Sequence, residues 1–271
     1  MSGPIGVFDS GIGGLTVVAA LRRRLPREPI VYLGDTARLP YGTKSPETVL
    51  GYTRRNLAFL RSRGVKAMVV ACNTASALAL PRLETDLPTW GVIGPGARRA
   101  AAAAKRRVGV IATAATVRSD AYRRALAELR PDLEVLSLPC PLFVPLVEEG
   151  WHEDPIAEQV ARRYLEPLLA AGIDTLVLGC THYPLLAPVI ARVAGPEVAL
   201  VDSAESVADE VAAGLAERGL TASADAAPET GETPAPPALH LCVTDAGAGF
   251  GDFAARILGE ETRPLEWVDV G

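Results

Sequence analysis

The sequence predicts an α/β protein made of two similar lobes. Short apolar runs alternate along the chain with longer segments of helical periodicity, a pattern typical of parallel strands joined by covering helices. The length of 271 residues is sufficient for two domains that each bury a core. The two halves of the chain also match each other in their motifs, which indicates that one α/β unit occurs twice.

The expected strands form two sets of four. Short apolar runs predict them at residues 5–8, 30–33, 67–71, 91–93, 108–112, 135–138, 176–179 and 198–201. Helical periodicity predicts helices over residues 15–25, 46–63, 75–84, 120–129, 154–171 and 204–218. Pro46 suits a first helical position, and Gly64 and Gly172 suit the residues that follow two helix ends.

The internal repeat is clearest around two cysteines. The segment GVKAMVVACNT (residues 64–74) lies 108 residues before GIDTLVLGCTH (residues 172–182). We therefore expect a first lobe of residues 1–95 and 206–271 and a second lobe of residues 96–205. A cleft between such lobes is the expected ligand site.

The C-terminal part adds small elements to the first lobe. Residues 221–238 contain no large apolar side chain and many Pro, Ala and Thr, so we expect a mobile surface loop there. After it, residues 239–243 are expected to form a strand and residues 250–258 an amphipathic helix. Both are too small to form a domain.

Composition excludes several classes of partner and cofactor. Apolar residues make up 49% and charged residues 22%, with a net charge of −5, which disfavours a nucleic-acid-binding protein. The chain has neither a membrane-spanning apolar run nor a secretion signal, so we expect a cytoplasmic protein. The four cysteines lie far apart without a C-x-x-C pair, so neither a metal site nor a disulfide framework is indicated.

Cys72 and Cys180 are the strongest candidates for chemistry. Each ends the third strand of its lobe, so the two thiols are expected to face the cleft from opposite sides. A following helix N-terminus would lower the pKa of each thiol, and would bind a carboxylate together with Thr74 and Thr181. Buried cysteines are often only small core residues, but matching positions in a repeat favour a function. Cys140 and Cys242 lack this setting, and we expect them to be structural.

Asp9 and Ser10 close the first strand and precede the glycines of residues 11–14. Asp9 could hold an ammonium group or assist a thiol, while the glycines would let a ligand approach the backbone. The alternative is a dinucleotide site with Asp35 on the ribose. It is disfavoured because the G-x-G-x-x-G pattern needs glycine where this chain has Thr16.

Five further positions carry weaker signals. His182 follows Cys180 by two residues and could act as its acid/base partner. Tyr41 and Gly42 lie in a turn-forming loop, where the alternative is an exposed tyrosine. Glu148 and Glu149 could assist catalysis or simply end a solvated helix.

At this point the sequence resembles the glutamate racemase family, within the cofactor-independent aspartate/glutamate racemases. Five motifs carry the resemblance, in this order: IGVFDSGIGGLTV, YLGDTARLPYG, VVACNTASA, PLFVPLVEEG and LVLGCTHYPLL. It extends from about residue 4 to residue 218 and more weakly beyond. The chain departs from the family at residues 244–247, TDAG, where a Thr-Thr-Gly stretch is usual.

The resemblance implies two lobes that enclose free glutamate, no cofactor, no metal, and a role in supplying D-glutamate for peptidoglycan. It implies that Cys72 and Cys180 are paired acid/base thiols, with Cys72 serving D-glutamate and Cys180 serving L-glutamate. Asp9 and His182 would tune these thiols, with help from Glu148 or Glu149. The implied substrate contacts are Asp9, Ser10, Tyr41, Gly42, Asn73, Thr74, Thr181 and His182. For the assembly we expect a homodimer.

The residues support this chemistry independently of the resemblance. Inversion through a carbanion needs a base on one face of the α-carbon and an acid on the other, and the repeat supplies one thiol to each face. Three alternatives stay open. They are a racemase for aspartate or a hydantoin, a hydrolase with a Cys180–His182 nucleophile, and a two-lobed binding protein without catalysis.

Overall fold

The computed structural model describes residues 3–222, 238–247, 249–259 and 264–271. Most of the loop expected at residues 221–238 therefore lies outside the described residues. Among the helices that are described, none combines the length and the apolar character that crossing a bilayer requires.

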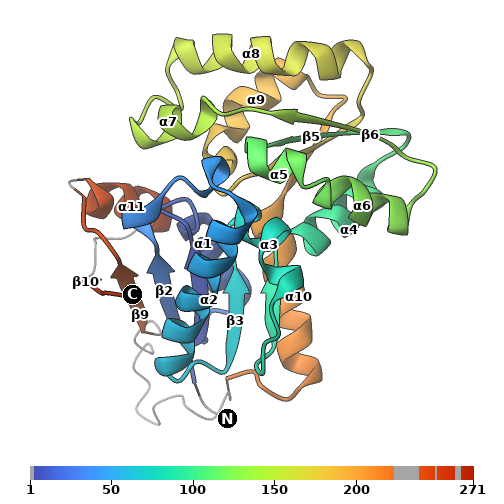
Figure 1. Cartoon of the computed structure of the whole chain (residues 1–271). Helices are drawn as coiled ribbons and strands as arrows, with labels where there is room; N and C mark the ends of the chain where they lie inside the picture. Colours follow the sequence, from blue (N-terminus) through green and yellow to red (C-terminus); the bar gives the residue numbers. More distant parts are fainter. Residues whose placement is uncertain (1–2, 223–237, 248, 260–263) are drawn as a thin grey trace, which may run out of the picture.

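Two separate parallel sheets form the framework, which confirms the predicted α/β class (Figure 1). The first has the order β10-β9-β2-β1-β3-β4 and the second has the order β6-β5-β7-β8. The first sheet comprises β1 (Ile5–Asp9), β2 (Ile30–Gly34), β3 (Ala67–Val70), β4 (Thr89–Gly91), β9 (Leu239–Val243) and β10 (Leu265–Trp267). The second comprises β5 (Arg107–Ala112), β6 (Glu134–Pro139), β7 (Thr175–Gly179) and β8 (Ala199–Asp202). We call each sheet with its covering helices a lobe.

Helices cover both faces of each sheet. On the first, α1 (Leu15–Arg24), α10 (Ser203–Glu217) and α11 (Phe250–Leu258) pack on one face, and α2 (Pro46–Ser62) and α3 (Asn73–Leu78) on the other. On the second, α7 (Phe143–Glu148), α8 (Pro155–Ala170) and α9 (Ala187–Ala194) lie opposite α4 (Ile93–Ala103) and α6 (Ala121–Leu129) (Figure 1). The short α5 (Ala114–Arg118) follows β5. The described residues also form the 3-10 helices η1 (Thr36–Arg38), η2 (Tyr41–Thr43), η3 (Leu80–Arg82) and η4 (Tyr183–Leu186).

Several elements differ from the sequence-based expectations. The helix expected over residues 75–84 is wrong at its C-terminal end, because Pro81 lacks the N–H that a continuing α-helix needs and α3 gives way to η3. The helix α4 was not predicted, since its first turn contains Gly94, Pro95 and Gly96, which resemble a turn. The C-terminal strand expected at residues 239–243 is confirmed as β9, which pairs with β2.

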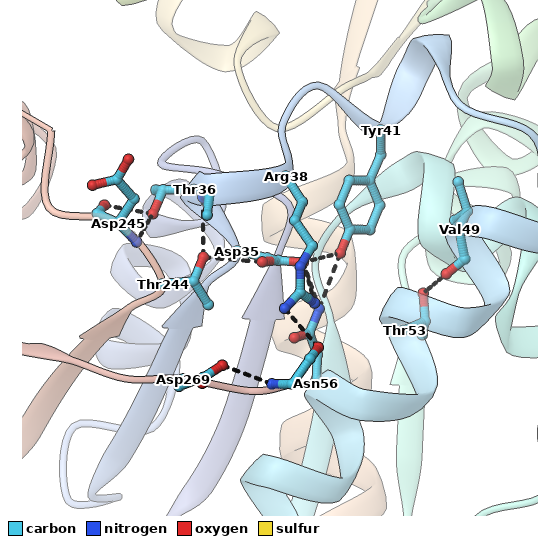
Figure 2. Close-up of polar contacts among 12 residues, drawn as sticks. Asp35, Thr36, Arg38, Tyr41, Val49, Thr53, Asn56, Thr244, Asp245 and Asp269 are labelled. Atoms are coloured by element: carbon cyan, nitrogen blue, oxygen red, sulfur yellow. Dashed lines mark hydrogen bonds and ion pairs between the residues drawn. The ribbon is translucent and has the colours of Figure 1, made fainter.

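A buried carboxyl group anchors the loop that follows β2. Asp35 has no exposed surface and accepts hydrogen bonds from the Tyr41 hydroxyl, from Asn56 Nδ2 at 3.2 Å and from Thr244 Oγ1 at 3.0 Å (Figure 2). Arg38 Nη1 lies 3.6 Å from the same carboxylate. Because these contacts engage the Asp35 carboxylate, it is not available to bind a ribose, as the alternative dinucleotide site would require.

The C-terminal segment holds the same loop from outside the sheet. The backbone N–H of Asp245 donates to Thr36 Oγ1 at 2.8 Å, and Arg38 Nη2 donates to the carbonyl of Gly271 at 2.8 Å. Residues 244–247 are the stretch in which the chain departs from the resembled pattern. Thr244 and Asp245 of this stretch therefore help to hold the loop that follows β2 in place.

We predict that Asp35→Ala lowers the free energy of unfolding by about 3–5 kcal/mol, because it leaves three hydrogen-bond donors and a guanidinium without their acceptor. Urea unfolding followed by circular dichroism measures this change. Asp86→Ala is the control, since its ion pair with Arg61 is exposed and should contribute at most about 1 kcal/mol. Equal losses in the two variants would contradict the anchoring role.

Candidate active site

A pocket lies where the carboxyl ends of the two sheets meet. The first lobe lines it with Ser10, Gly11, Leu39, Pro40, Tyr41, Gly42, Cys72, Asn73 and Thr74. The second lobe lines it with Thr113, Val144, Glu148, Cys180, Thr181 and His182. The site residues expected from the sequence are in this lining except Glu149, the alternative to Glu148, and Asp9, which hydrogen-bonds to the lining residues Gly11 and Thr181.

Cys72 reaches the pocket between β3 and α3. Its side chain is buried, and its Sγ donates a hydrogen bond to Ser10 Oγ at 3.4 Å. Burial, together with the negative charge of Asp9, raises the pKa of the Cys72 thiol to about 12. The lowered pKa expected from the helix N-terminus is therefore wrong for Cys72, since α3 offsets little of the desolvation in this closed site.

Cys180 occupies the corresponding place after β7, but it has a different partner. Its Sγ lies 3.8 Å from His182 Nδ1, and His182 Nε2 lies 3.2 Å from Glu148 Oε1. These contacts form a chain of sulfur, imidazole and carboxylate at one side of the pocket. Of the two candidate glutamates, the structure therefore places Glu148 beside His182.

The charge of His182 follows from these contacts. Burial, the largest single effect, lowers the pKa of the imidazole, but the hydrogen bonds to Cys180 and Glu148 and the Coulomb attraction of these two groups together raise the pKa to about 10. At neutral pH His182 is therefore an imidazolium. It places a positive charge beside Cys180, whereas Cys72 has a hydroxyl and lies near a carboxylate.

Asp9 joins the two lobes behind the pocket. Its side chain is fully buried, accepts a hydrogen bond from the backbone N–H of Gly11 at 3.0 Å and accepts another from Thr181 Oγ1 at 3.3 Å. Burial raises the pKa of Asp9, and the positive charge of His182 opposes that effect. The carboxyl group therefore acts on the second lobe through Thr181 and His182.

Two glycines allow this close approach. A Cβ atom at Gly14 would lie 2.3 Å from the Cβ of Asp9, and one at Gly13 would lie 2.6 Å from both His182 Nδ1 and Thr181 Oγ1. A side chain at Gly13 would push the lobes apart, whereas one at Gly14 would collide with Asp9 of the same lobe. These glycines were expected to let a ligand approach the backbone, whereas in the structure Gly13 lets the lobes pack against each other and Gly14 leaves room for the Asp9 side chain.

Tyr41 and Gly42 close the pocket from the anchored loop. Tyr41 is almost fully buried, so the alternative of an exposed tyrosine is wrong. Its hydroxyl points away from the pocket to Asp35 (Figure 2). A Cβ at Gly42 would lie 2.8 Å from the Cβ of Thr113, so this loop also packs against the second lobe.

A cluster of three threonine hydroxyls lies at the junction of the lobes. Thr74 Oγ1 is 2.9 Å from Thr113 Oγ1 and 3.2 Å from Thr116 Oγ1. The sequence analysis missed Thr113 and Thr116. The repeat contained a signal for Thr113, because GVF at residues 6–8 matches GVI at 109–111 and the same offset of 103 residues takes Ser10 to Thr113.

The remaining cysteines lie elsewhere. Cys140 Sγ is 3.8 Å from the carbonyl of Leu138, and Cys242 Sγ is 3.7 Å from Glu266 Oε2. Neither residue belongs to the pocket lining. Within the described part of the chain, no three side chains of the His, Cys, Asp and Glu types group as a metal site would require.

Comparison with known proteins places the chain in a family. A family model described as Asp/Glu/Hydantoin racemase matches residues 15–211. A glutamate racemase from Geobacter metallireducens is 52% identical over 258 residues, which cover 94% of this chain and 92% of the relative.

Solved structures agree with these sequence matches. A glutamate racemase isoform from Bacillus anthracis superposes with a TM-score of 0.91 at 39% identity and covers 98% of this chain and 97% of its own. A glutamate racemase from Francisella tularensis, solved in complex with D-glutamate, gives a TM-score of 0.89 at 38% identity, with coverage of 99% and 98%. The chain therefore belongs to the glutamate racemase family, within the Asp/Glu/hydantoin racemases, and is an isomerase.

Proposed function

We propose that the protein interconverts L-glutamate and D-glutamate with Cys72 and Cys180 as its two acid/base groups. The observation that carries this proposal is that two thiols, one from each lobe, open on the same pocket. The relative from Francisella tularensis, with D-glutamate bound, supports glutamate as the ligand. The product would supply peptidoglycan synthesis in the cytoplasm, and we also propose that the chain forms a homodimer.

The surroundings of the thiols favour one starting state. Cys72, with a pKa of about 12, is a neutral thiol that can give up a proton, while Cys180 has the imidazole of His182 3.8 Å from its sulfur. Cys180 as the base and Cys72 as the acid form the pair that L-glutamate needs.

The reaction then consists of two proton transfers. The Cys180 thiolate removes the α-hydrogen of L-glutamate as a proton, and the electron pair remains on the α-carbon and its carboxylate. The Cys72 thiol delivers its proton to the opposite face, which yields D-glutamate and leaves the thiolate on Cys72. Proton exchange with solvent restores the starting state, and D-glutamate reacts by the reverse sequence.

Hydrogen-bond donors near the thiols suit a carboxylate-rich substrate. The threonine cluster offers hydroxyls from both lobes, and the Asn73 amide and Ser10 hydroxyl lie beside Cys72 in the lining. Such donors stabilise the charge that develops on the α-carboxylate during proton removal. Asp9 lies behind this lining, so we assign it the positioning of Thr181 rather than direct contact with the ammonium group.

We predict that the purified protein racemises L-glutamate and turns over L-aspartate at least 100-fold less efficiently. A substrate shortened by one methylene cannot satisfy all of the buried polar groups, and such groups are costly to leave unpaired. Chiral chromatography of the products measures both rates. Comparable aspartate turnover would reject glutamate as the specific substrate and leave the two-thiol mechanism standing.

We predict that Cys72→Ala and Cys180→Ala each abolish net racemisation in both directions, because each thiol is the base in one direction and the acid in the other. In D₂O, Cys72→Ala should still exchange the α-hydrogen of L-glutamate slowly, and Cys180→Ala that of D-glutamate. Proton NMR follows this exchange.

The variants Cys140→Ala and Cys242→Ala are the controls, and both should racemise glutamate at wild-type rates. Normal racemisation by Cys72→Ala would contradict the mechanism. A covalent acyl-enzyme trapped on Cys180 in mass spectra would instead support the hydrolase alternative.

We predict that Glu148→Gln lowers the pKa of His182 from about 10 toward the ordinary value near 6.5, because it removes the carboxylate that stabilises the imidazolium. A raised folded-state pKa contributes stability that is complete below about pH 6.5 and is lost as the pH rises through about 10. The variant should therefore lose the most stability near pH 5 to 6, less at pH 8 to 9, and almost none above about pH 10.

NMR titration of the imidazole and urea unfolding at these pH values test both effects. Glu149→Gln is the matched control, since it removes the same charge one residue farther along the chain. An unchanged His182 pKa in Glu148→Gln would contradict the assignment.

A further inference from the structure

Tyr122 is a buried residue of the second lobe that touches the first. It lies on α6, is 2% exposed, and its hydroxyl donates a hydrogen bond to Asn73 Oδ1 at 2.7 Å. Asn73 belongs to the other lobe, directly after Cys72, and lines the pocket. A side chain outside the pocket lining therefore holds one that is part of it.

The amide nitrogen of Asn73 differs from its oxygen: among the described residues, the buried Nδ2 has no hydrogen-bond partner. Because Oδ1 is engaged by Tyr122, the amide keeps its two N–H donors for whatever fills the pocket. A carboxylate has only acceptors, so this orientation attracts it, whereas the flipped amide would present an oxygen to an oxygen.

The phenol is well suited to fix this orientation. Burial and the nearby charge of Asp202 raise the pKa of Tyr122, with a hydrogen bond from Ser203 as the opposing contribution, so the phenol stays protonated. A protonated phenol can donate its proton to Asn73, as the structure shows.

Two glycines fix the ring itself. A Cβ at Gly96 on α4 would lie 3.2 Å from both Cε1 and the hydroxyl oxygen of Tyr122, and a Cβ at Gly179 would lie 3.1 Å from Cε2. Gly179 directly precedes Cys180, just as Asn73 directly follows Cys72. One ring therefore contacts the chain neighbours of both thiols.

We propose that Tyr122 is a positioning residue that orients the Asn73 amide toward a substrate carboxylate and sets the start of α3 against the end of β7. This inference rests on the proposed function, since it names the group that prepares the pocket for glutamate. Tyr122 acts through Asn73 and needs no contact with the substrate.

The test is a double-mutant cycle of Tyr122→Phe with Asn73→Ala, measured by glutamate racemisation. Tyr122→Phe should raise KM for glutamate by about threefold to tenfold and change kcat less, because it weakens a contact made in both ground and transition states. In the Asn73→Ala background the same change should alter KM by less than about twofold. Tyr164→Phe is the control, since its hydroxyl lies outside the pocket lining and accepts a hydrogen bond from the backbone N–H of Leu142, so the change should leave KM unchanged.

A second variant covers the case in which Tyr122→Phe does not fold. Gly96→Ala keeps the hydroxyl but presses on the ring, and it should raise KM in the wild-type background and not in Asn73→Ala. Equal KM effects with and without Asn73, or an unchanged KM in Tyr122→Phe, would overturn the inference.

These outcomes are distinguishable from failure of the proposed function. If the wild-type protein does not racemise glutamate, the proposed function fails. Calorimetric titration with glutamate then tests the inference alone. A threefold to tenfold rise in Kd for Tyr122→Phe supports the inference, and an unchanged Kd rejects it.

Discussion

The hydrogen bond between Asp9 and Thr181 is the contact on which the rest of the site depends. It joins the end of β1 to the residue after Cys180, and it requires glycine at position 13 so that the lobes can approach and at position 14 so that the Asp9 side chain fits. The charge of Asp9 adds to burial in raising the pKa of Cys72, while the positive charge of His182 lowers the pKa of Asp9. One polar group thus contributes both to the contact between the lobes and to the electrostatics of the Cys72 thiol.

Repetition of the α/β unit supplies symmetry of position but not of chemistry. Both cysteines follow the third strand of their lobe, yet Cys72 donates to the Ser10 hydroxyl while Cys180 lies beside an imidazolium held by Glu148. The proposed mechanism needs one sulfur charged and the other neutral at the start of each turnover. The different partners of the two cysteines suit these different roles, which identical surroundings would not distinguish.

Local patterns in the sequence predicted the structural elements that depend on residues close together in the chain. Apolar runs located the main strands, and β4, expected at residues 91–93 and found at Thr89–Gly91, was displaced by two residues. The repeat identified both thiols and the pocket residues that follow them in the chain. Long-range contacts could not be read in this way, because the ring of Tyr122 and the hydroxyl of Thr116 reach Asn73 and Thr74 only after the lobes pack. The pKa of Cys72 was mispredicted for the same reason, since its burial arises in a core cluster with residues distant in the chain, such as Tyr41.

Several hydrogen bonds beside the pocket cross between the lobes. Asp9–Thr181, Thr74–Thr113 and Asn73–Tyr122 all join one lobe to the other, and each contributes a net of about 0.5–1.5 kcal/mol. Apolar packing adds to them, since Phe253 of the first lobe belongs to a core cluster of the second. The Asn73 Nδ2 group gains nothing from these contacts, since it has no partner among the described residues. A carboxylate ligand would give that group a partner only while Tyr122 holds the amide in place, so the ligand and this contact between the lobes would stabilise each other.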